Sequence, residues 1–186
     1  MIEQAARGSS HGARIAQETR EEKGMSARIP GSVSDLVRRA HHTALCVEDF
    51  AAARDFFVDI LGFTVEGEMD QRQEPGLAAV VALPGAVIRW GMLMRDHYRI
   101  ELFKYYQPAG RKDPVRQCDL GYTHMAFEVT DVEAAYARLT GAGYRTTCPP
   151  QKLRGGRSKV IYLLAPENNV VELIEFPALP VQVESK

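Results

Sequence analysis

Two short segments of the chain repeat one arrangement that places a histidine ahead of small and apolar residues. Residues 42–49 read His-Thr-Ala-Leu-Cys-Val-Glu-Asp and residues 124–131 read His-Met-Ala-Phe-Glu-Val-Thr-Asp. The shared pattern is His-x-Ala-apolar-x-Val-x-Asp, and the two copies lie 82 residues apart. Neutral imidazole is a common ligand of divalent metals, so His42 and His124 are candidate metal ligands in duplicated positions.

Each histidine has a matching glutamate in a later segment. Glu101 lies between Ile100 and Leu102, and Glu172 lies between Val171 and Leu173. Side chains alternate across a strand, so if the apolar neighbours face a helix layer, both glutamates face the opposite side. His42 and His124 are expected on that same side, because the apolar residues that follow them point to the helices. Each half therefore predicts one histidine and one glutamate on a common face.

If the two halves meet about a pseudo-twofold axis, His42, Glu101, His124 and Glu172 converge in one cleft. Two imidazoles and two carboxylates suit one divalent ion per site, Zn, Ni, Co, Mn or Fe(II), and ligand type alone does not choose among them. Taken singly, each residue is more often a structural histidine or a solvent-facing glutamate. The duplication favours a metal, because carboxylates held together without a cation are costly to desolvate.

The elements that position these residues follow from local patterns. Each first strand ends at an aspartate suited to capping a helix, Asp49 or Asp131, and the predicted helices end at glycines, Gly62 and Gly141 or Gly143. Further strands are expected over 64–69, 87–94, 99–105, 145–148, 159–164 and 170–176, with a short helix over 76–82. The prediction is an α+β protein of two βαβββ modules, whose curved mixed sheets surround the metal cleft.

We expect five segments along the chain. These are a flexible N-terminal arm over 1–35, a first module over 36–110, a linker over 111–121, a second module over 122–176 and a C-terminal tail over 177–186. The arm is rich in Gly, Ser, Glu and Arg and has few apolar residues, so it cannot bury enough surface to offset its ordering entropy.

Composition excludes several classes of function. The 186 residues carry 23 Lys and Arg against 24 Asp and Glu, a net charge of -1, which gives no footprint for nucleic acid. Apolar runs are too short to cross a bilayer, and no signal-peptide pattern opens the chain. Three widely spaced cysteines suggest neither a disulfide framework nor a thiolate zinc site. We expect a cytoplasmic protein that acts on a small molecule, without nucleic-acid or membrane partners.

Over residues 38–176 the chain resembles the vicinal oxygen chelate superfamily, which includes glyoxalase I, methylmalonyl-CoA epimerase, extradiol dioxygenases and fosfomycin- and bleomycin-type resistance proteins. The resemblance rests on the two histidine patterns, the Phe-Phe-Val-Asp-Ile-Leu-Gly-Phe run over 56–63 and the Ile-Glu-Leu and Val-Glu-Leu strands. It implies that His42, Glu101, His124 and Glu172 occupy the ligand positions of the glyoxalase I subgroup. Family habit suggests a homodimer, and whether the modules pair within one chain or between two stays open.

The resemblance also implies a metal-dependent lyase or isomerase that stabilises an enediolate or enolate of a carbonyl substrate chelated through two oxygens. A ligand glutamate would act as the base, with Glu172 the first candidate and Glu101 the second. Glutathione-using members commonly carry Arg at the position of Cys46 and Asn at that of Tyr105, so the expected partners of glutathione are absent. Methylmalonyl-CoA epimerases usually carry Gln at the position of Glu101.

Four more residues are candidates for substrate binding, by alternation on the same face: Arg99, Phe103, Cys46 and Glu128. A solvated or ion-paired arginine and an inert cysteine are the more common outcomes.

Two other functions compete with the lyase or isomerase. An extradiol dioxygenase would bind Fe(II) through two histidines and one glutamate. Glu101 would be a fourth protein ligand, and this disfavours the dioxygenase. A metal-free drug-binding protein of the bleomycin type is the other, although such relatives usually lack the full ligand set.

Overall fold

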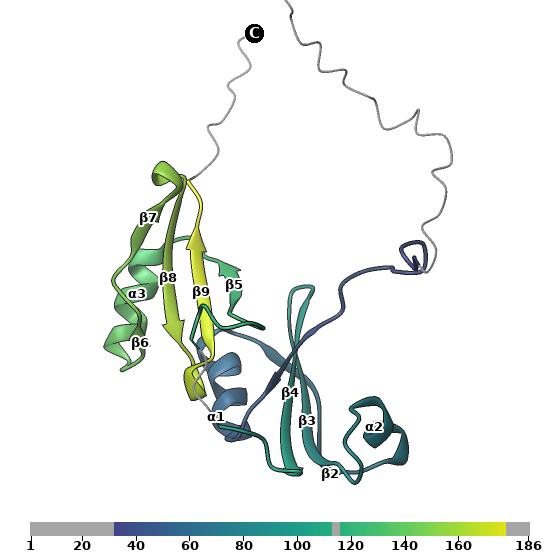
Figure 1. Ribbon diagram of the computed structural model, residues 1–186. Coiled ribbons are helices and arrows are strands. Elements are labelled where there is room, and N and C mark those ends of the chain that lie inside the picture. The colour runs from purple at the N-terminus through teal and green to yellow at the C-terminus, as the bar shows by residue number, and fades with distance from the viewer. Residues whose placement is uncertain (1–31, 113–115, 178–186) are drawn as a thin grey trace, which may run out of the picture. The chain divides into compact units, whose positions relative to one another are not determined.

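The computed structural model describes residues 32–112 and 116–177 (Figure 1). The N-terminal arm and the C-terminal tail expected from the sequence therefore lie mostly outside the described residues. Contacts divide the chain between Ala40 and His41, and the second unit carries the strands and helices discussed below. In the described part of the first unit, Leu36 and Val37 each donate a backbone N–H to the carbonyl of Val33 in a single turn.

The first half folds as one βαβββ module with a short inserted helix. Its elements are β1 (Thr43–Cys46), α1 (Phe50–Asp55), the π-helical turn η1 (Phe56–Ile60), β2 (Thr64–Arg72), α2 (Pro75–Val80), β3 (Val87–Arg95) and β4 (Tyr98–Gln107). The strands form a sheet in the order β1-β4-β3-β2, in which β1 and β4 run parallel and the other neighbours antiparallel. The predicted helix over 76–82 is confirmed as α2, with Pro75 at its first position.

The second half repeats this plan with one additional strand. Its elements are β5 (Met125–Glu128), α3 (Val132–Gly141), β6 (Arg145–Thr146), β7 (Gln151–Leu153), the 3-10 turn η2 (Arg154–Gly156), β8 (Ser158–Leu164), the 3-10 turn η3 (Pro166–Asn168) and β9 (Val170–Glu175). The sheet order is β5-β9-β8-β6, and β7 also pairs with β8. Figure 1 shows α3 alongside β8. The expected strand over 145–148 is thus only two residues long, and β7 takes up pairing that the sequence did not predict.

Both predicted helix caps form. The Asp49 carboxylate accepts a hydrogen bond from the backbone N–H of Ala52 at 3.0 Å, and Asp131 does the same for Ala134 at 2.9 Å. The turns after the helices contain Gly62 at φ +71° and Gly143 at φ +88°, a left-handed conformation that favours glycine.

The first helix differs from the predicted one in its last turn. A regular helix was expected up to Gly62, but the hydrogen-bonding pattern changes to a π turn at Phe56, and the Leu61 N–H donates to the Phe56 carbonyl. This widening lets two consecutive aromatic residues, Phe56 and Phe57, each be 2% exposed. The Phe56 ring then lies 5.6 Å from the ring of Tyr144 in the second half.

The two halves share one hydrophobic core, built from the helix-facing sides of both sheets. Leu45 and Leu102 contribute from the first sheet, and Ile161 and Leu173 from the second. These residues alternate in sequence with the candidate ligand faces, as the apolar pattern predicted. The packing therefore directs the histidine and glutamate face of each sheet away from the shared core.

A carboxylate from the second half also caps the first helix of the first half. Glu167, in η3, has φ +59° and accepts backbone hydrogen bonds from Glu48 at 2.8 and 2.9 Å and from Asp49 at 2.5 Å. An acidic group is favourable at a helix N-terminus because unpaired N–H groups gather there. This contact ties α1 to the loop that precedes β9.

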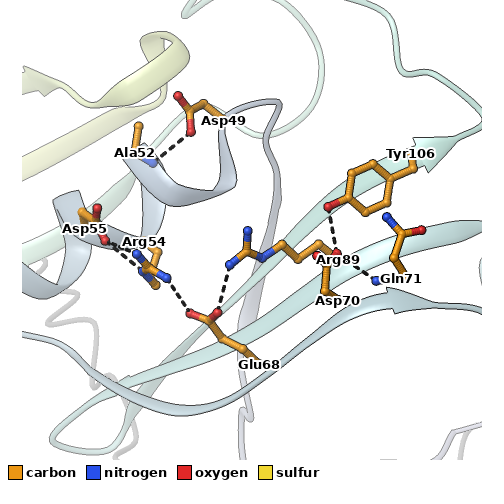
Figure 2. A network of polar contacts seen from close by, with 9 residues as sticks. All are labelled: Asp49, Ala52, Arg54, Asp55, Glu68, Asp70, Gln71, Arg89 and Tyr106. Carbon is orange, nitrogen blue, oxygen red and sulfur yellow. Dashed lines mark hydrogen bonds and ion pairs between the residues drawn. The ribbon is translucent and has the colours of Figure 1, made fainter.

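Polar side chains bind α1 to the outer strands of the first sheet. Figure 2 shows the carboxylate of Glu68 on β2 between the guanidinium groups of Arg54, at 3.4 Å, and Arg89, at 3.2 Å. Arg89 also lies over the ring of Phe50, 4.4 Å from its centre. In the same figure the Tyr106 hydroxyl donates to Asp70 at 2.8 Å. These contacts fix the side of the sheet opposite to the candidate ligands.

Candidate metal centre

The structure forms both of the histidine and glutamate pairs that the sequence predicts. In the first sheet the parallel register places Ala44 opposite Glu101, so His42 reaches the carboxylate, with Nε2 3.0 Å from Oε2. In the second sheet Ala126 lies opposite Glu172, and His124 Nε2 is again 3.0 Å from Oε2. The duplicated sequence has therefore produced duplicated geometry.

The environments of the two pairs are alike. The side chains of both glutamates are 15% exposed, while His42 and His124 are 34% and 29% exposed. The other ring nitrogen of each histidine contacts the preceding residue: Nδ1 of His42 lies 2.8 Å from Nδ1 of His41, and Nδ1 of His124 lies 3.1 Å from the Thr123 hydroxyl. A contact at Nδ1 orients the ring and leaves Nε2 on the side of the carboxylate, where a metal would bind.

Two aromatic residues that the sequence analysis did not select complete these surroundings. The Trp90 indole N–H donates to Oε1 of Glu101 at 2.6 Å, from the adjacent strand β3. The ring of Tyr162, on β8, lies 5.1 Å from the ring of His124. Both residues come about ten positions before their glutamate, which is the spacing of a β-hairpin partner, and that spacing is the signal that could have found them.

The two pairs do not merge within one chain. Across residues 32–112 and 116–177, no cluster of three or more histidine, cysteine, aspartate or glutamate side chains is placed to hold a metal. Each pair alone offers one imidazole nitrogen and one carboxylate oxygen, which is half of the predicted set. The donor chemistry suits a divalent ion of the Zn, Ni, Co, Mn or Fe(II) kind, provided that the two halves of the set come together.

The predicted substrate-binding residues have varied surroundings. Arg99 forms a two-pronged ion pair with Glu66, at 2.5 and 2.8 Å, so its charge is already matched. The ring of Phe103 stacks on that of Tyr105, with centres 6.0 Å apart. Glu128 is exposed at the end of β5. The structure thus places Arg99 in the ion-paired state that the sequence analysis named as the more common outcome.

Cys46 lies beside an open cleft of about 880 Å³ at the end of β1, together with Tyr105 and Glu167. Its side chain keeps contact with solvent. Partial desolvation, helped by the negative charges of Glu167 and Glu48, raises the pKa of the Cys46 thiol above its ordinary value. A raised pKa disfavours the thiolate, so this environment does not suit a nucleophile.

Comparison with known proteins assigns the chain to one family. Residues 39–173 match the model of the Glyoxalase/Bleomycin resistance protein/Dioxygenase superfamily. The chain belongs to this superfamily. Its resemblance to the vicinal oxygen chelate proteins and the predicted fold class are thereby confirmed.

Within the superfamily, the chain is similar to several curated proteins. It is 33% identical to the uncharacterized protein YaeR of Escherichia coli over 55% of this chain and 70% of that protein. It is 29% identical to a 2-epi-5-epi-valiolone epimerase of Actinomyces, over 81% of this chain and 83% of the enzyme. An ethylmalonyl-CoA/methylmalonyl-CoA epimerase of Cereibacter sphaeroides is 26% identical, over 72% of this chain and 92% of that enzyme.

Solved structures share the fold at lower identity. A glyoxalase family protein from Bacillus cereus aligns with a TM-score of 0.68 at 22% identity, covering 78% of this chain and 98% of that one. The trypanothione-dependent glyoxalase I of Leishmania major aligns with a TM-score of 0.53 at 20% identity, covering 75% of this chain and 87% of that one.

Among the described helices of the present chain, none combines the length and the apolar character needed to span a membrane.

Proposed function

We propose that the protein is a metal-dependent isomerase of the epimerase kind, which moves a proton on a carbon beside a carbonyl group. The observation that carries the proposal is the pair of equivalent contacts, His42 to Glu101 and His124 to Glu172, each at 3.0 Å on the face away from the core. Similarity to two enzymes named as epimerases supports an isomerase over the other reactions of the superfamily.

We propose further that one complete site is built from two copies of the chain. Within a chain, the shared core joins the helix-facing sides of the two sheets, so the His42 and Glu101 pair and the His124 and Glu172 pair each present an incomplete set. A twofold dimer can place the first pair of one copy against the second pair of its partner, and it then forms two equal sites. This arrangement joins four ligands without breaking the core.

At such a site His42, Glu101, His124 and Glu172 would hold a divalent cation. The bound cation supplies Lewis-acid stabilisation of negative charge on two neighbouring substrate oxygens. Glu172 would then remove the proton from the adjacent carbon through one carboxylate oxygen. A proton from solvent added to the opposite face of the carbon inverts its configuration, and the proton held by Glu172 then returns to solvent, while Glu101 stays in place as a ligand.

Complementation between two inactive variants tests the shared site. His42→Ala spoils the first half and His124→Ala the second, so neither homodimer has an intact site. When equal amounts of the two variants are unfolded, mixed and refolded, about half of the dimers are heterodimers, and each heterodimer has one intact site. The mixture should therefore bind about 0.25 metal ions per chain. A mixture that remains free of metal, while the wild type binds about one ion per chain, would rule out a site formed across two copies.

Deuterium incorporation tests the reaction class. The names of the relatives supply two probes, methylmalonyl-CoA and 2-epi-5-epi-valiolone. With the metal-loaded protein in D₂O, we expect deuterium to enter the carbon beside the carbonyl of at least one probe, and Glu172→Gln to abolish this entry. Oxygen uptake with catechols would instead identify a dioxygenase, and tight binding of bleomycin by protein stripped of metal would identify a drug-binding protein.

A further inference from the structure

Although the two pairs are equivalent by sequence, a single hydrogen bond distinguishes them. Oε2 of Glu101 faces His42, and its other oxygen, Oε1, accepts the indole N–H of Trp90 at 2.6 Å. Both oxygens of this carboxylate are therefore engaged, one toward the ligand histidine and one toward a fixed donor. A short bond from a donor to a charged acceptor is among the stronger and more directional contacts of a protein.

In residues 32–112 and 116–177, no donor equivalent to Trp90 reaches the Glu172 carboxylate. Among the described residues, the hydrogen bonds and ion pairs of the Glu172 carboxylate are limited to the contact with His124. Exposure does not account for the difference, because both glutamate side chains are 15% exposed. One oxygen of Glu172 is consequently not held by the part of the protein that the structure describes.

The registers of the two sheets explain how this asymmetry arises. Trp90 lies opposite Phe103, two residues beyond Glu101 on the same face. The matching position in the second sheet is Val160, which lies opposite Ile174, two residues beyond Glu172. Valine has no donor to offer, so the duplicated fold carries a donor in one half and an aliphatic side chain in the other.

We infer that Trp90 is a positioning residue that fixes Glu101 as the stationary carboxylate of the site and leaves Glu172 as the one that can turn. The inference rests on the proposed function, and it assigns different roles to two ligands that the duplication made alike. With Oε1 held by the indole, Glu101 presents Oε2 alone to the ion. Among the described residues, Glu172 would have to release only its contact with His124 to rotate between the ion and the substrate, as a base must, whereas Glu101 would also have to break the bond from Trp90.

Trp90 is the only tryptophan of the chain, and this makes the hydrogen bond directly observable. In protein labelled with ¹⁵N, one indole N–H resonance should appear, displaced downfield by the carboxylate. We expect Glu101→Gln to move this resonance upfield and to speed exchange of its proton with water, while the matched variant Glu172→Gln leaves it in place. A resonance that ignores Glu101→Gln, or that responds equally to both variants, would overturn the inference.

The role toward the metal is tested with Co²⁺, whose visible spectrum reports coordination. Trp90→Phe keeps an aromatic ring and removes the donor, so we expect a changed Co²⁺ spectrum and about a tenfold weaker affinity. Tyr162→Phe, the control beside the other pair, should stay within about twofold of wild type, because its hydroxyl holds neither carboxylate in the described structure. The thermal unfolding of both apo variants is measured alongside, which separates a loss of fold from a loss of positioning.

The outcomes separate this inference from the proposed function. If wild type binds Co²⁺ and Trp90→Phe binds it with the same affinity and spectrum, the positioning role is wrong while the metal site stands. If wild type binds no divalent metal, the proposed function fails, and the division of roles fails with it whatever the indole resonance does. Expected results in both the resonance and the Co²⁺ experiments support the assignment of Trp90 as the residue that fixes Glu101.

Discussion

Replacing Glu167 by alanine removes the carboxylate that caps α1 from the second half of the chain. Three hydrogen-bond contacts are lost, two from the N–H of Glu48 and one from the N–H of Asp49. Bonds to charged acceptors contribute more than neutral ones, but Glu167 is exposed and solvent replaces part of the loss. From the usual cost of losing a helix cap, we expect the free energy of unfolding to fall by about 1.5–2 kcal/mol.

A glycine variant at the same position gives a matched comparison. Glu167 has φ +59°, and this conformation costs a residue with a side chain about 1 kcal/mol relative to glycine. Glu167→Gly loses the same hydrogen bonds as Glu167→Ala but relieves that cost. It should therefore be more stable than the alanine variant by about 1 kcal/mol.

Urea unfolding followed by circular dichroism measures both differences. The dependence of the free energy of unfolding on urea concentration should be the same in all variants, so that a shifted midpoint reports a change in stability. An alanine variant within about 0.5 kcal/mol of wild type would show that the cap contributes little, since changes of that size are usual at surface sites. Equal stability of the alanine and glycine variants would contradict the left-handed conformation assigned to this residue.

Two further predictions concern the first half of the chain. Gly91→Ala places a methyl group 2.7 Å from the Phe50 ring, so we expect the free energy of unfolding to fall by about 1–3 kcal/mol, whereas Gly76→Ala, in helix α2 with open space around it, should lose no stability because a helix favours alanine over glycine. The hydrogen bond from Arg99 lowers the pKa of Glu66 below its ordinary value of 4.5. The ion pair therefore contributes fully to stability above the pKa that Glu66 has in the unfolded chain. This contribution is lost as the pH falls through the lower pKa of Glu66 in the folded protein. In Arg99→Gln, the free energy of unfolding should depend less on pH in that acidic range. An unaltered acid profile in Arg99→Gln, or equal losses in the two glycine variants, would contradict these contacts.

Much of this fold could be predicted from the sequence because the informative signals are local and occur twice. The aspartates that cap α1 and α3, the glycines after them and the alternation around Glu101 and Glu172 each act over a few residues. Alternation alone was enough to place each histidine on the face of its glutamate, and the parallel registers of β1 with β4 and of β5 with β9 then brought them together.

Other features were not predictable because they depend on contacts between distant segments. The π turn at Phe56 accompanies the burial of both Phe56 and Phe57, and the Phe56 ring packs near the second half. The helical spacing of the sequence does not indicate this turn. The hairpin spacing indicates that Trp90 lies near Glu101, but the hydrogen bond between them depends on the register of β3 against β4, which the sequence left open. Whether the two pairs meet within a chain or across two chains depends on how modules pair, and no local pattern encodes that choice.

The metal content of protein purified without chelator, measured by elemental analysis, shows whether His42, Glu101, His124 and Glu172 bind a divalent ion. We expect about one divalent ion per chain in wild type and almost none in His42→Ala and His124→Ala. His97→Ala changes a histidine in the turn between β3 and β4 and should retain the wild-type content. A wild-type protein that takes up no divalent metal, or a His124→Ala variant that keeps its full content, would contradict the claim.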